Sequence, residues 1–368
     1  MAKLPLILLL FRLLIGAAFA GPAEFTLGAD VSFLPQVEAG GGVFREDGVP
    51  VDPLVFIRNC GLEMVRLRLW HAPADGHSGL AEALALGRRA KAAGLGILLD
   101  FHYSDTWADP GSQTKPAAWA GLPFPDLADS MHTYTRDVLT AFADLGVAPT
   151  VVQIGNEISP GMLWDDGRVD GGFDTPTQWA RLAQLIRSGI AGVDEALPGA
   201  LRPQVMIHLD RGGDNGASRW FFDNLIAQGV DFDLIGLSYY PWWHGDLADL
   251  EGNLSDLAGR YGKGLMVVET AYPWTLGWFD ETHNVVGLPD HLLPGYPATP
   301  AGQAAFLTAV LDVVQGVPDG LGRGLFIWAP EWIAAPGLGS SWENLALFDQ
   351  EGRALPAWNL DTAATLVR

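Results

Sequence analysis

The sequence has a single cysteine, Cys60, among its 368 residues. One cysteine cannot form a disulfide within the chain, and it cannot build a thiolate metal site or a redox pair. Cys60 lies in the apolar run from Leu54 to Leu62, so we expect it to be a core residue. The fold must therefore be stabilised by packing rather than by covalent cross-links.

Basic residues are also scarce, with 22 Lys and Arg against 43 Asp and Glu, which gives a formal net charge of −21. They are scattered along the chain and form no cluster that could neutralise a phosphate backbone. We therefore expect no nucleic-acid partner. Because an acidic surface repels polyanions, a neutral polymer is an easier substrate for this protein than an acidic one.

Long hydrophobic runs are confined to the first twenty residues. Lys3 gives a positive start, residues 4–15 are apolar, and Ala18-Phe19-Ala20 offers small residues at a cleavage position. This order is typical of a secretory signal peptide, whose cleavage would leave Gly21 as the first residue. The alternative is an uncleaved membrane anchor, which Arg12 disfavours because it interrupts a run already short for a bilayer span. We expect a secreted or periplasmic protein without membrane contact after cleavage.

Repeats, low-complexity tracts and Ser- or Pro-rich linkers are absent, so residues 21–368 are expected to form one domain. That segment contains short apolar runs that alternate with amphipathic helical patterns. The expected strands are Phe25–Val31, Met64–Leu69, Gly96–Phe101, Thr150–Ile154, Gln204–His208, Leu234–Ser238, Gly264–Val268 and Gly324–Trp328.

Several of these strands lack polar alternation, as in Ile97-Leu98-Leu99, which is typical of parallel strands covered on both faces. An eightfold strand–helix repeat predicts a single-domain α/β protein, a (β/α)8 TIM barrel. A doubly wound sheet would normally carry a glycine-rich phosphate turn after its first strand, and Gly28-Ala29-Asp30 is not one.

Polar and aromatic residues follow the expected strands at their carboxyl ends, which is where barrels build their active sites. The candidate substrate-binding residues from these strand ends and the loops beyond them are Arg66, His102, Asp105, Trp107, Asn156, His208, Asp210, Tyr239, Tyr240, Trp274, Trp328 and Trp342. The chain has 14 tryptophans, and those in the loops can stack on the apolar faces of sugar rings.

Two glutamates come directly after apolar strands, Glu157 after the fourth and Glu269 after the seventh. These strands lie on opposite sides of an eight-stranded ring, so the two side chains should face each other across its mouth. Glycoside hydrolysis needs one carboxylic acid to protonate the leaving oxygen and one carboxylate to attack or to activate water. We therefore expect Glu157 and Glu269 to be the catalytic pair.

Neighbouring residues can support this pair. Asn156 can hydrogen-bond a sugar 2-hydroxyl. A phenolic hydroxyl from Tyr239 or Tyr240, or a charge from Arg66 or Arg68, can keep one carboxylate ionised, and the sequence leaves both choices open.

Several motifs together resemble the arabinogalactan endo-β-1,4-galactanases of glycoside hydrolase family 53. The resemblance covers nearly the whole mature chain, and residues 99–110, Leu-Asp-Phe-His-Tyr-Ser-Asp-Thr-Trp-Ala-Asp-Pro, are its most specific part. Further matching segments are residues 28–32, 65–70, 153–158, 206–210, 238–241, 267–270 and 337–341.

The resemblance implies internal cleavage of β-1,4-galactan, the neutral side chain of pectic arabinogalactan, with retention of anomeric configuration. It implies that Glu157 is the acid/base and Glu269 the nucleophile. The long loop after Glu269 also resembles a calcium-binding loop of bacterial family members, with Asp280, His283 and Asn284 as the candidate ligands and His283 using its backbone oxygen. The alternative is a solvated polar loop without a metal.

We expect chemistry that requires no cofactor and a monomeric enzyme whose partner is the polysaccharide. Two other readings stay open: a retaining barrel hydrolase acting on β-mannan or β-glucan, and a glycan-binding protein without turnover.

Overall fold

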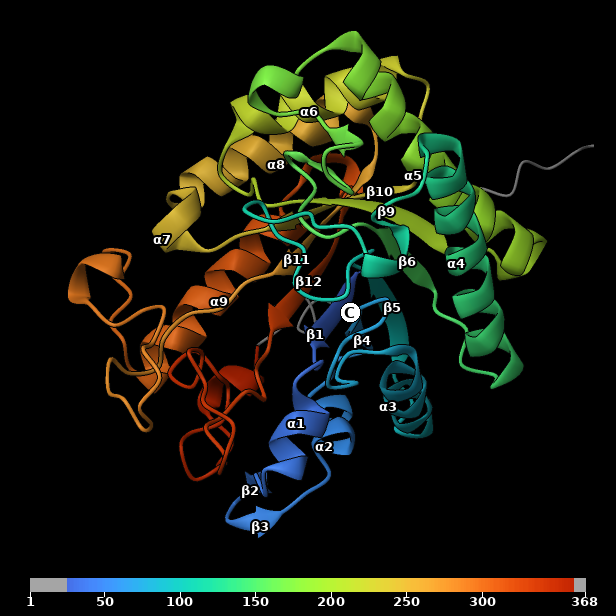
Figure 1. The fold of residues 1–368 in the computed structure, drawn as a ribbon. Helices are drawn as coiled ribbons and strands as arrows, with labels where there is room; N and C mark the ends of the chain where they lie inside the picture. Colours follow the sequence, from blue (N-terminus) through green and yellow to red (C-terminus); the bar gives the residue numbers. More distant parts are fainter. Residues whose placement is uncertain (1–24, 361–368) are drawn as a thin grey trace, which may run out of the picture.

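The computed structural model describes residues 25–360, and the expected signal peptide lies outside them. Its central feature is a closed barrel of eight parallel strands, which confirms the predicted (β/α)8 fold (Figure 1). In order around the barrel, the strands are β1 (Thr26–Asp30), β4 (Met64–Leu69), β5 (Gly96–Phe101), β6 (Val151–Ile154), β9 (Gln204–Leu209), β10 (Leu234–Ser238), β11 (Gly264–Glu269) and β12 (Gly322–Trp328). Pairing of β12 with β1 closes the ring.

Helices surround the barrel and carry the chain from one strand to the next (Figure 1). They are α1 (Leu34–Ala39), α2 (Pro53–Asn59), α3 (Leu80–Ala92), α4 (Phe124–Asp144), α5 (Pro176–Ala196), α6 (Asn215–Ala227), α7 (Pro241–His244), α8 (Leu247–Tyr261) and α9 (Pro300–Gln315). Side chains cap the N-termini of several helices. Asp246 and Asp249 form a capping box at α8, and Thr299 caps α9 before Pro300. Within residues 25–360, none of these helices combines the length and apolarity needed to cross a bilayer.

The remaining elements are short. One hairpin, β2 (Arg45–Glu46) with β3 (Val49–Pro50), lies in the first crossover, and another, β7 (Gly161–Met162) with β8 (Gly167–Arg168), follows β6. Single turns of 3-10 helix are η1 (Ala117–Trp119), η2 (Gly171–Phe173), η3 (Gly199–Leu201), η4 (Pro289–His291), η5 (Pro318–Gly320) and η6 (Pro356–Trp358).

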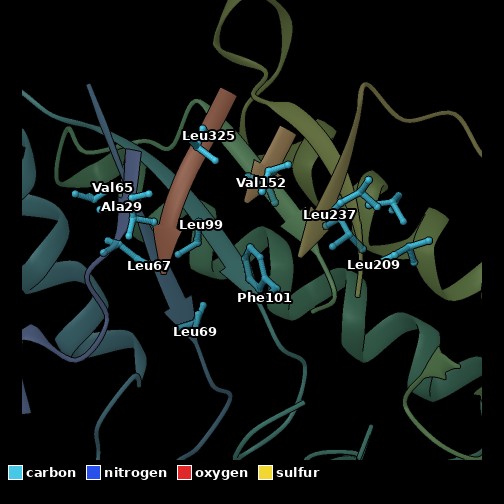
Figure 2. Packing of buried hydrophobic residues seen from close by; sticks show 14 of the residues in the cluster. Ala29, Val65, Leu67, Leu69, Leu99, Phe101, Val152, Leu209, Leu237 and Leu325 are labelled. Atoms are coloured by element: carbon cyan, nitrogen blue, oxygen red, sulfur yellow. The ribbon is translucent and has the colours of Figure 1, made fainter. Parts of the chain in front are cut away.

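Side chains on the outer face of the strands form the larger hydrophobic core (Figure 2). Val65, Leu67 and Leu69 show the pattern on β4, where every second residue joins the buried cluster shared with the helices. This is the period of two that strand geometry imposes. Burial of this face positions the alternate residues of each strand inside the barrel.

The inner face is apolar at the bottom and polar above. The buried inner cluster contains Leu98, Val151, Met206, Leu234, Met266, Val268 and Phe326, with Met64 packed against it. On β1 the matching position is Gly28, where a Cβ would lie 2.2 Å from the ring of Phe326, so only glycine fits there. Two residues further along their strands come Asp30, Arg66, Asp100, Gln153 and His208, and Ser238 comes four residues after Leu234; all six are buried. These polar residues form the floor of the site.

Strand β11 breaks this alternation. Leu237 of β10 pairs with Val267, but the next residue, Ser238, pairs with Glu269, so Val268 is an extra residue of β11. Val268 belongs to the inner cluster, and strict alternation would turn the following residue outward. The bulge instead brings Glu269 into the barrel, where it meets Arg66.

Candidate active site

Glu157 is positioned by the turn after β6. Gly155 has φ 84° and Glu157 itself has φ 46°, so the backbone enters the left-handed region twice within three residues. For a side chain larger than glycine this conformation costs about 1–3 kcal/mol, and such costs cluster at functional sites. The turn places Glu157 at the mouth of the barrel, where it lines the cleft.

Glu269 is held by two partners at the end of β11. Arg66 Nη2 lies 2.9 Å from Glu269 Oε1, and the hydroxyl of Tyr240 donates to Oε2 at 3.1 Å. Tyr239 points elsewhere, since its hydroxyl donates to the carbonyl of Gly245 and its ring stacks on Phe306 of α9. Of the two pairs that the sequence left open, Tyr240 and Arg66 therefore contact Glu269.

The two carboxylates lie close together. A carboxylate oxygen of Glu157, one of Glu269 and a ring nitrogen of His208 all lie within 4.8 Å of one another. A direct displacement on a sugar requires carboxyl groups about 5–5.5 Å apart, whereas an intervening water requires about 6.5–9.5 Å. The observed proximity fits the shorter class.

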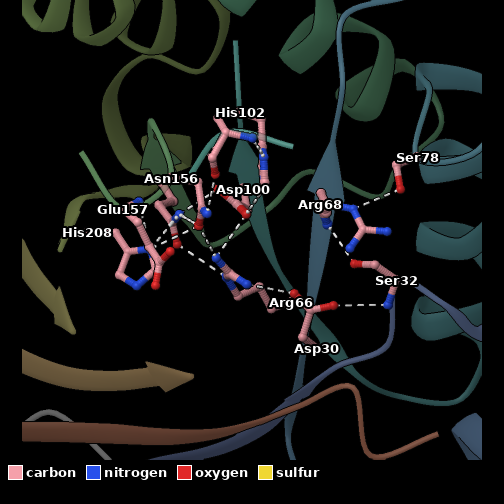
Figure 3. Close-up of polar contacts among 12 residues, drawn as sticks. Asp30, Ser32, Arg66, Arg68, Ser78, Asp100, His102, Asn156, Glu157 and His208 are labelled. Atoms are coloured by element: carbon pink, nitrogen blue, oxygen red, sulfur yellow. Dashed lines mark hydrogen bonds and ion pairs between the residues drawn. The ribbon is translucent and has the colours of Figure 1, made fainter. Parts of the chain in front are cut away.

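Arg66 is the centre of the polar floor (Figure 3). Besides Glu269, its guanidinium pairs with Asp30 at 2.7 Å and with Asp100 at 2.9 Å, and it donates to Asn156 Oδ1 at 2.8 Å. Burial disfavours the charge of Arg66, but the nearby carboxylates of Asp100, Glu269 and Asp30 together raise its pKa. This arginine therefore remains a fixed cation beneath the cleft.

The electrostatics separate the two glutamates. Burial, followed by the charges of Glu269 and Asp210, raises the pKa of Glu157 well above its ordinary value. Burial also raises the pKa of Glu269, but only to about 7, because Arg66 and the hydroxyl of Tyr240 stabilise its ionised form. When one proton is shared by the pair, it therefore stays on Glu157.

A cleft of about 140 Å³ opens above the two glutamates. Seven of the predicted substrate-binding residues line it, namely Arg66, His102, Trp107, Asn156, Tyr240, Trp328 and Trp342. Trp328 contacts both other tryptophans, with ring centroids 6.1 Å from Trp107 and 4.6 Å from Trp342. These rings form one aromatic wall of the cleft.

Five other predicted substrate-binding residues do not line this cleft: Asp105, His208, Asp210, Tyr239 and Trp274. Asp105 accepts the backbone amides of Ala72 and Ala117, so it fixes loops. His208 is fully buried below the cleft, and Trp274 stacks on Phe279 in the loop after β11. Asp210 accepts a hydrogen bond from Ser159.

Other residues of the site were not selected from the sequence. Asp30, Asp100, Gln153 and Ser238 belong to the buried polar floor, while Asp109 lines the cleft. Trp243, one of the tryptophans that the sequence places at the strand ends and in the loops, lines the cleft as well. The signal for the floor residues was available, because each is a polar residue in or at the end of an apolar strand. Arg68 also lines the cleft, and its guanidinium lies 4.1 Å from the ring of Trp107.

The three predicted metal ligands in the loop after β11 differ in their contacts. Asp280 accepts the backbone amides of Thr282 and Ser340, and the ring of His283 packs against Trp278 with centroids 4.7 Å apart. Asn284 Oδ1 and Glu343 Oε2 are buried without a hydrogen-bond partner. These two orphaned oxygens are suitable hard ligands, and Glu343 was not selected from the sequence.

A closed (β/α)8 barrel with two facing carboxylates at the carboxyl ends of its strands defines the class of barrel glycoside hydrolases. The sequence model of glycosyl hydrolase family 53 matches residues 26–360. The chain belongs to this family and is a glycoside hydrolase.

Individual relatives agree with this assignment. An uncharacterized protein of Niallia circulans is 47% identical over 91% of this chain and 93% of its own length. An arabinogalactan endo-β-1,4-galactanase of Thermothelomyces thermophilus is 38% identical over 89% of this chain and 96% of its own length. The solved family 53 catalytic domain of Ignisphaera aggregans is 36% identical, covers 93% of this chain and 96% of its own, and superposes with a TM-score of 0.86.

Proposed function

We propose that the protein is an endo-β-1,4-galactanase that cleaves the galactan side chains of pectic arabinogalactan with retention of configuration. The observation that carries the proposal is the pair Glu157 and Glu269, with oxygens within 4.8 Å of each other in an aromatic-walled cleft. The names of the galactanase relatives support the choice of substrate.

The proposed reaction has two steps. In the first, the carboxylate of Glu269 attacks the anomeric carbon while Glu157 gives its proton to the departing glycosidic oxygen. In the second, the carboxylate of Glu157 takes a proton from water, whose oxygen attacks the same carbon and releases Glu269. The two pKa shifts support these roles, because the acid must stay protonated and the nucleophile must ionise more easily. The chemistry uses two carboxylates and water, and it requires no cofactor.

The remaining polar residues suit transition-state binding. Asn156 Nδ2 donates to the carbonyl of Ala108, and Asn156 Oδ1 accepts from Arg66, which fixes the amide beside Glu157. We propose that this amide binds the sugar 2-hydroxyl and that Trp107, Trp328 and Trp342 stack on sugar rings.

The test is incubation of the purified protein with linear β-1,4-galactan, β-mannan and β-glucan, followed by separation of the products. We expect galactan oligosaccharides of several lengths and, by NMR, initial products in the β configuration. Faster cleavage of mannan or glucan would favour the rival substrate, and binding of galactan without cleavage would favour a glycan-binding protein. Initial α products would contradict retention.

We propose that a structural calcium binds in the loop after β11, with Asp280, Asn284, Glu343 and the backbone oxygen of His283 as candidate ligands. The two buried, unpartnered oxygens support this site. Calcium would cross-link the loop by joining carboxylate, amide and carbonyl oxygens. We expect a higher Tm with calcium than after chelation, and an unchanged Tm would contradict the site.

Secretion and the monomeric state are also proposals. Amino-terminal sequencing of exported protein should give Gly21, and retention of Met1 would contradict a cleaved signal. Light scattering of the purified enzyme should give the mass of one chain.

A further inference from the structure

Ser238 links the proposed acid/base to the interior of the barrel. It ends β10 and is fully buried. Its hydroxyl donates to Glu157 Oε1 at 2.6 Å, and the same Oγ lies 2.9 Å from Nε2 of His208. The structure shows no hydrogen bond within residues 25–360 to the other oxygen of this carboxylate, Oε2.

Donor counting fixes the direction of these bonds. The backbone amide of Glu157 can only donate, and it donates to Nδ1 of His208, so the single hydrogen of a neutral imidazole lies on Nε2 and is donated to Ser238 Oγ. The one hydrogen of the serine hydroxyl is then donated to Glu157 Oε1. Burial, with the charge of Arg66, lowers the pKa of His208 well below its ordinary value, so this imidazole is neutral and carries a single hydrogen.

The other ring nitrogen, His208 Nδ1, is then an acceptor. The backbone amide of Glu157 donates to it at 3.4 Å, while the side-chain amide of Gln153 lies 3.1 Å from it and also donates to Asp100 at 2.5 Å. Asn156 Oδ1, 3.0 Å from the same nitrogen, accepts a hydrogen from Arg66. The series of hydrogen bonds from His208 through Ser238 therefore presents a fixed donor to Glu157 Oε1.

A fixed donor at one oxygen makes the two oxygens of Glu157 chemically different. Oε1 must act as an acceptor, so a proton on this carboxyl group belongs on Oε2. We propose that Ser238 is a positioning residue that keeps Oε1 of Glu157 as an acceptor and so directs the catalytic proton to Oε2. This inference rests on the proposed role of Glu157 as acid/base, and it adds that the acid acts through one of its two oxygens.

Removal of the serine hydroxyl should leave the other groups that face Glu157 in place. These are Glu269 from β11, Asp210 and His208 from β9 and its loop, Arg66 from β4, and Tyr240 after β10. The effect of a Ser238 variant on Glu157 therefore reports the lost hydrogen bond.

The experiment compares wild type with Ser238→Ala on two substrates, β-1,4-galactan and an aryl β-galactobioside with a nitrophenolate leaving group. Galactan needs the proton of Glu157 for the first step, whereas nitrophenolate leaves without one. We expect kcat/KM on galactan to fall about tenfold and kcat/KM on the aryl substrate to fall no more than about twofold, since a misplaced general acid forfeits part of its about 10²–10⁴-fold contribution.

The pH profile gives a second readout. Ser238 stabilises the ionised form of Glu157, so its removal should raise the pKa of that group and move the alkaline limb of kcat/KM on galactan upward. We expect a shift of about one pH unit, which corresponds to a hydrogen bond to a charged group. A merely structural role for Ser238 would slow both substrates alike and leave the limb in place.

Two further variants complete the design. Ser238→Cys keeps the shape of the side chain but replaces a strong donor with a weak one. It should show the losses expected for Ser238→Ala, and it takes the place of that variant if the alanine variant does not fold. Ser218→Ala removes another fully buried hydroxyl, on α6, and should leave both readouts unchanged. Equal losses on the two substrates, or an unmoved alkaline limb, would overturn the role of Ser238 but not the proposed function. Wild type that does not cleave galactan would overturn the proposed function as well.

Discussion

Arg66 and Glu269 form an ion pair of 2.9 Å inside the barrel. Arg66 is shared with Asp30 and Asp100, so one guanidinium balances three carboxylates that are all nearly inaccessible to water. The stability of the polar floor and the ionisation of Glu269 therefore depend on the same side chain.

Replacement of Arg66 by Met should destabilise the protein by about 3–5 kcal/mol, because it leaves buried carboxylates without their cation. It should also raise the pKa of Glu269 and move the acidic limb of activity to higher pH. Urea unfolding and the pH dependence of kcat/KM measure the two effects. Arg66→Lys keeps the charge but not the planar guanidinium, so it should lose less stability and shift the acidic limb less than Arg66→Met. An unchanged urea midpoint in Arg66→Met would contradict the shared-cation account.

The roles of the two glutamates can be separated by chemical rescue. Glu269→Ala should abolish both steps, and azide should restore turnover by direct attack, which gives an α-azide product of inverted configuration. Glu157→Ala should retain activity on an aryl substrate with a good leaving group, and azide should then give a β-azide product. NMR of the azide products distinguishes the variants. Products of the same configuration from both would show that the roles are assigned wrongly.

The pH profile follows from the two pKa shifts. Activity needs ionised Glu269, whose pKa is raised to about 7, and protonated Glu157, whose pKa is raised further. We therefore expect kcat/KM to rise with pH on an acidic limb near 7 and to fall on a more alkaline limb. Tyr240→Phe removes a donor to Glu269 and should move only the acidic limb upward. A shift of the alkaline limb alone would contradict the assignment.

A third buried carboxyl group makes stability depend on pH. Glu331 is fully buried, accepts the amide of Phe33 through Oε1 and has no partner at Oε2. Burial, followed by the charge of Asp30, raises its pKa well above the ordinary value of 4.5. A raised carboxyl pKa means that the folded state prefers the neutral form, so stability is lost as pH rises above 4.5.

Glu331→Gln removes this titration. The difference in Tm between the variant and wild type should move in favour of the variant from pH 4.5 to pH 8. Glu251→Gln, on the exposed surface of α8, is the matched control and should show no such trend. A Tm difference for Glu331→Gln that stays constant with pH would show that Glu331 is ionised in the folded protein.

The barrel was predictable because its signals are local. Strands such as Gly96–Phe101 are short apolar runs between helical patterns, and the structure has the same bounds for that strand. The strand before Glu157 begins one residue later than expected, at Val151, and the last barrel strand begins two residues earlier, at Gly322. Such differences at the ends of strands do not move the site.

The details of the site depend on contacts that no local pattern encodes. Tyr239 and Tyr240 are adjacent, and only the pairing of β10 with its neighbours decides that Tyr240 meets Glu269 while Tyr239 packs on α9. The buried bonds of His208 and Ser238 likewise join strands far apart in sequence. Asp105 was predicted to bind substrate because it follows β5, but its carboxylate accepts hydrogen bonds from the backbone of two loops.

The bulge at Val268 makes the chemistry depend on backbone geometry as well as on residue types. Gly264 pairs with Leu234 of the inner cluster, and Glu269 is the fifth residue after Gly264, so strict alternation would turn Glu269 toward the surrounding helices. Straightening of the strand at its full length would therefore misdirect this carboxylate, whereas deletion of Val268 would let regular alternation point it inward. A comparison of related sequences that checks only the residue types of this strand would miss the feature that aims Glu269.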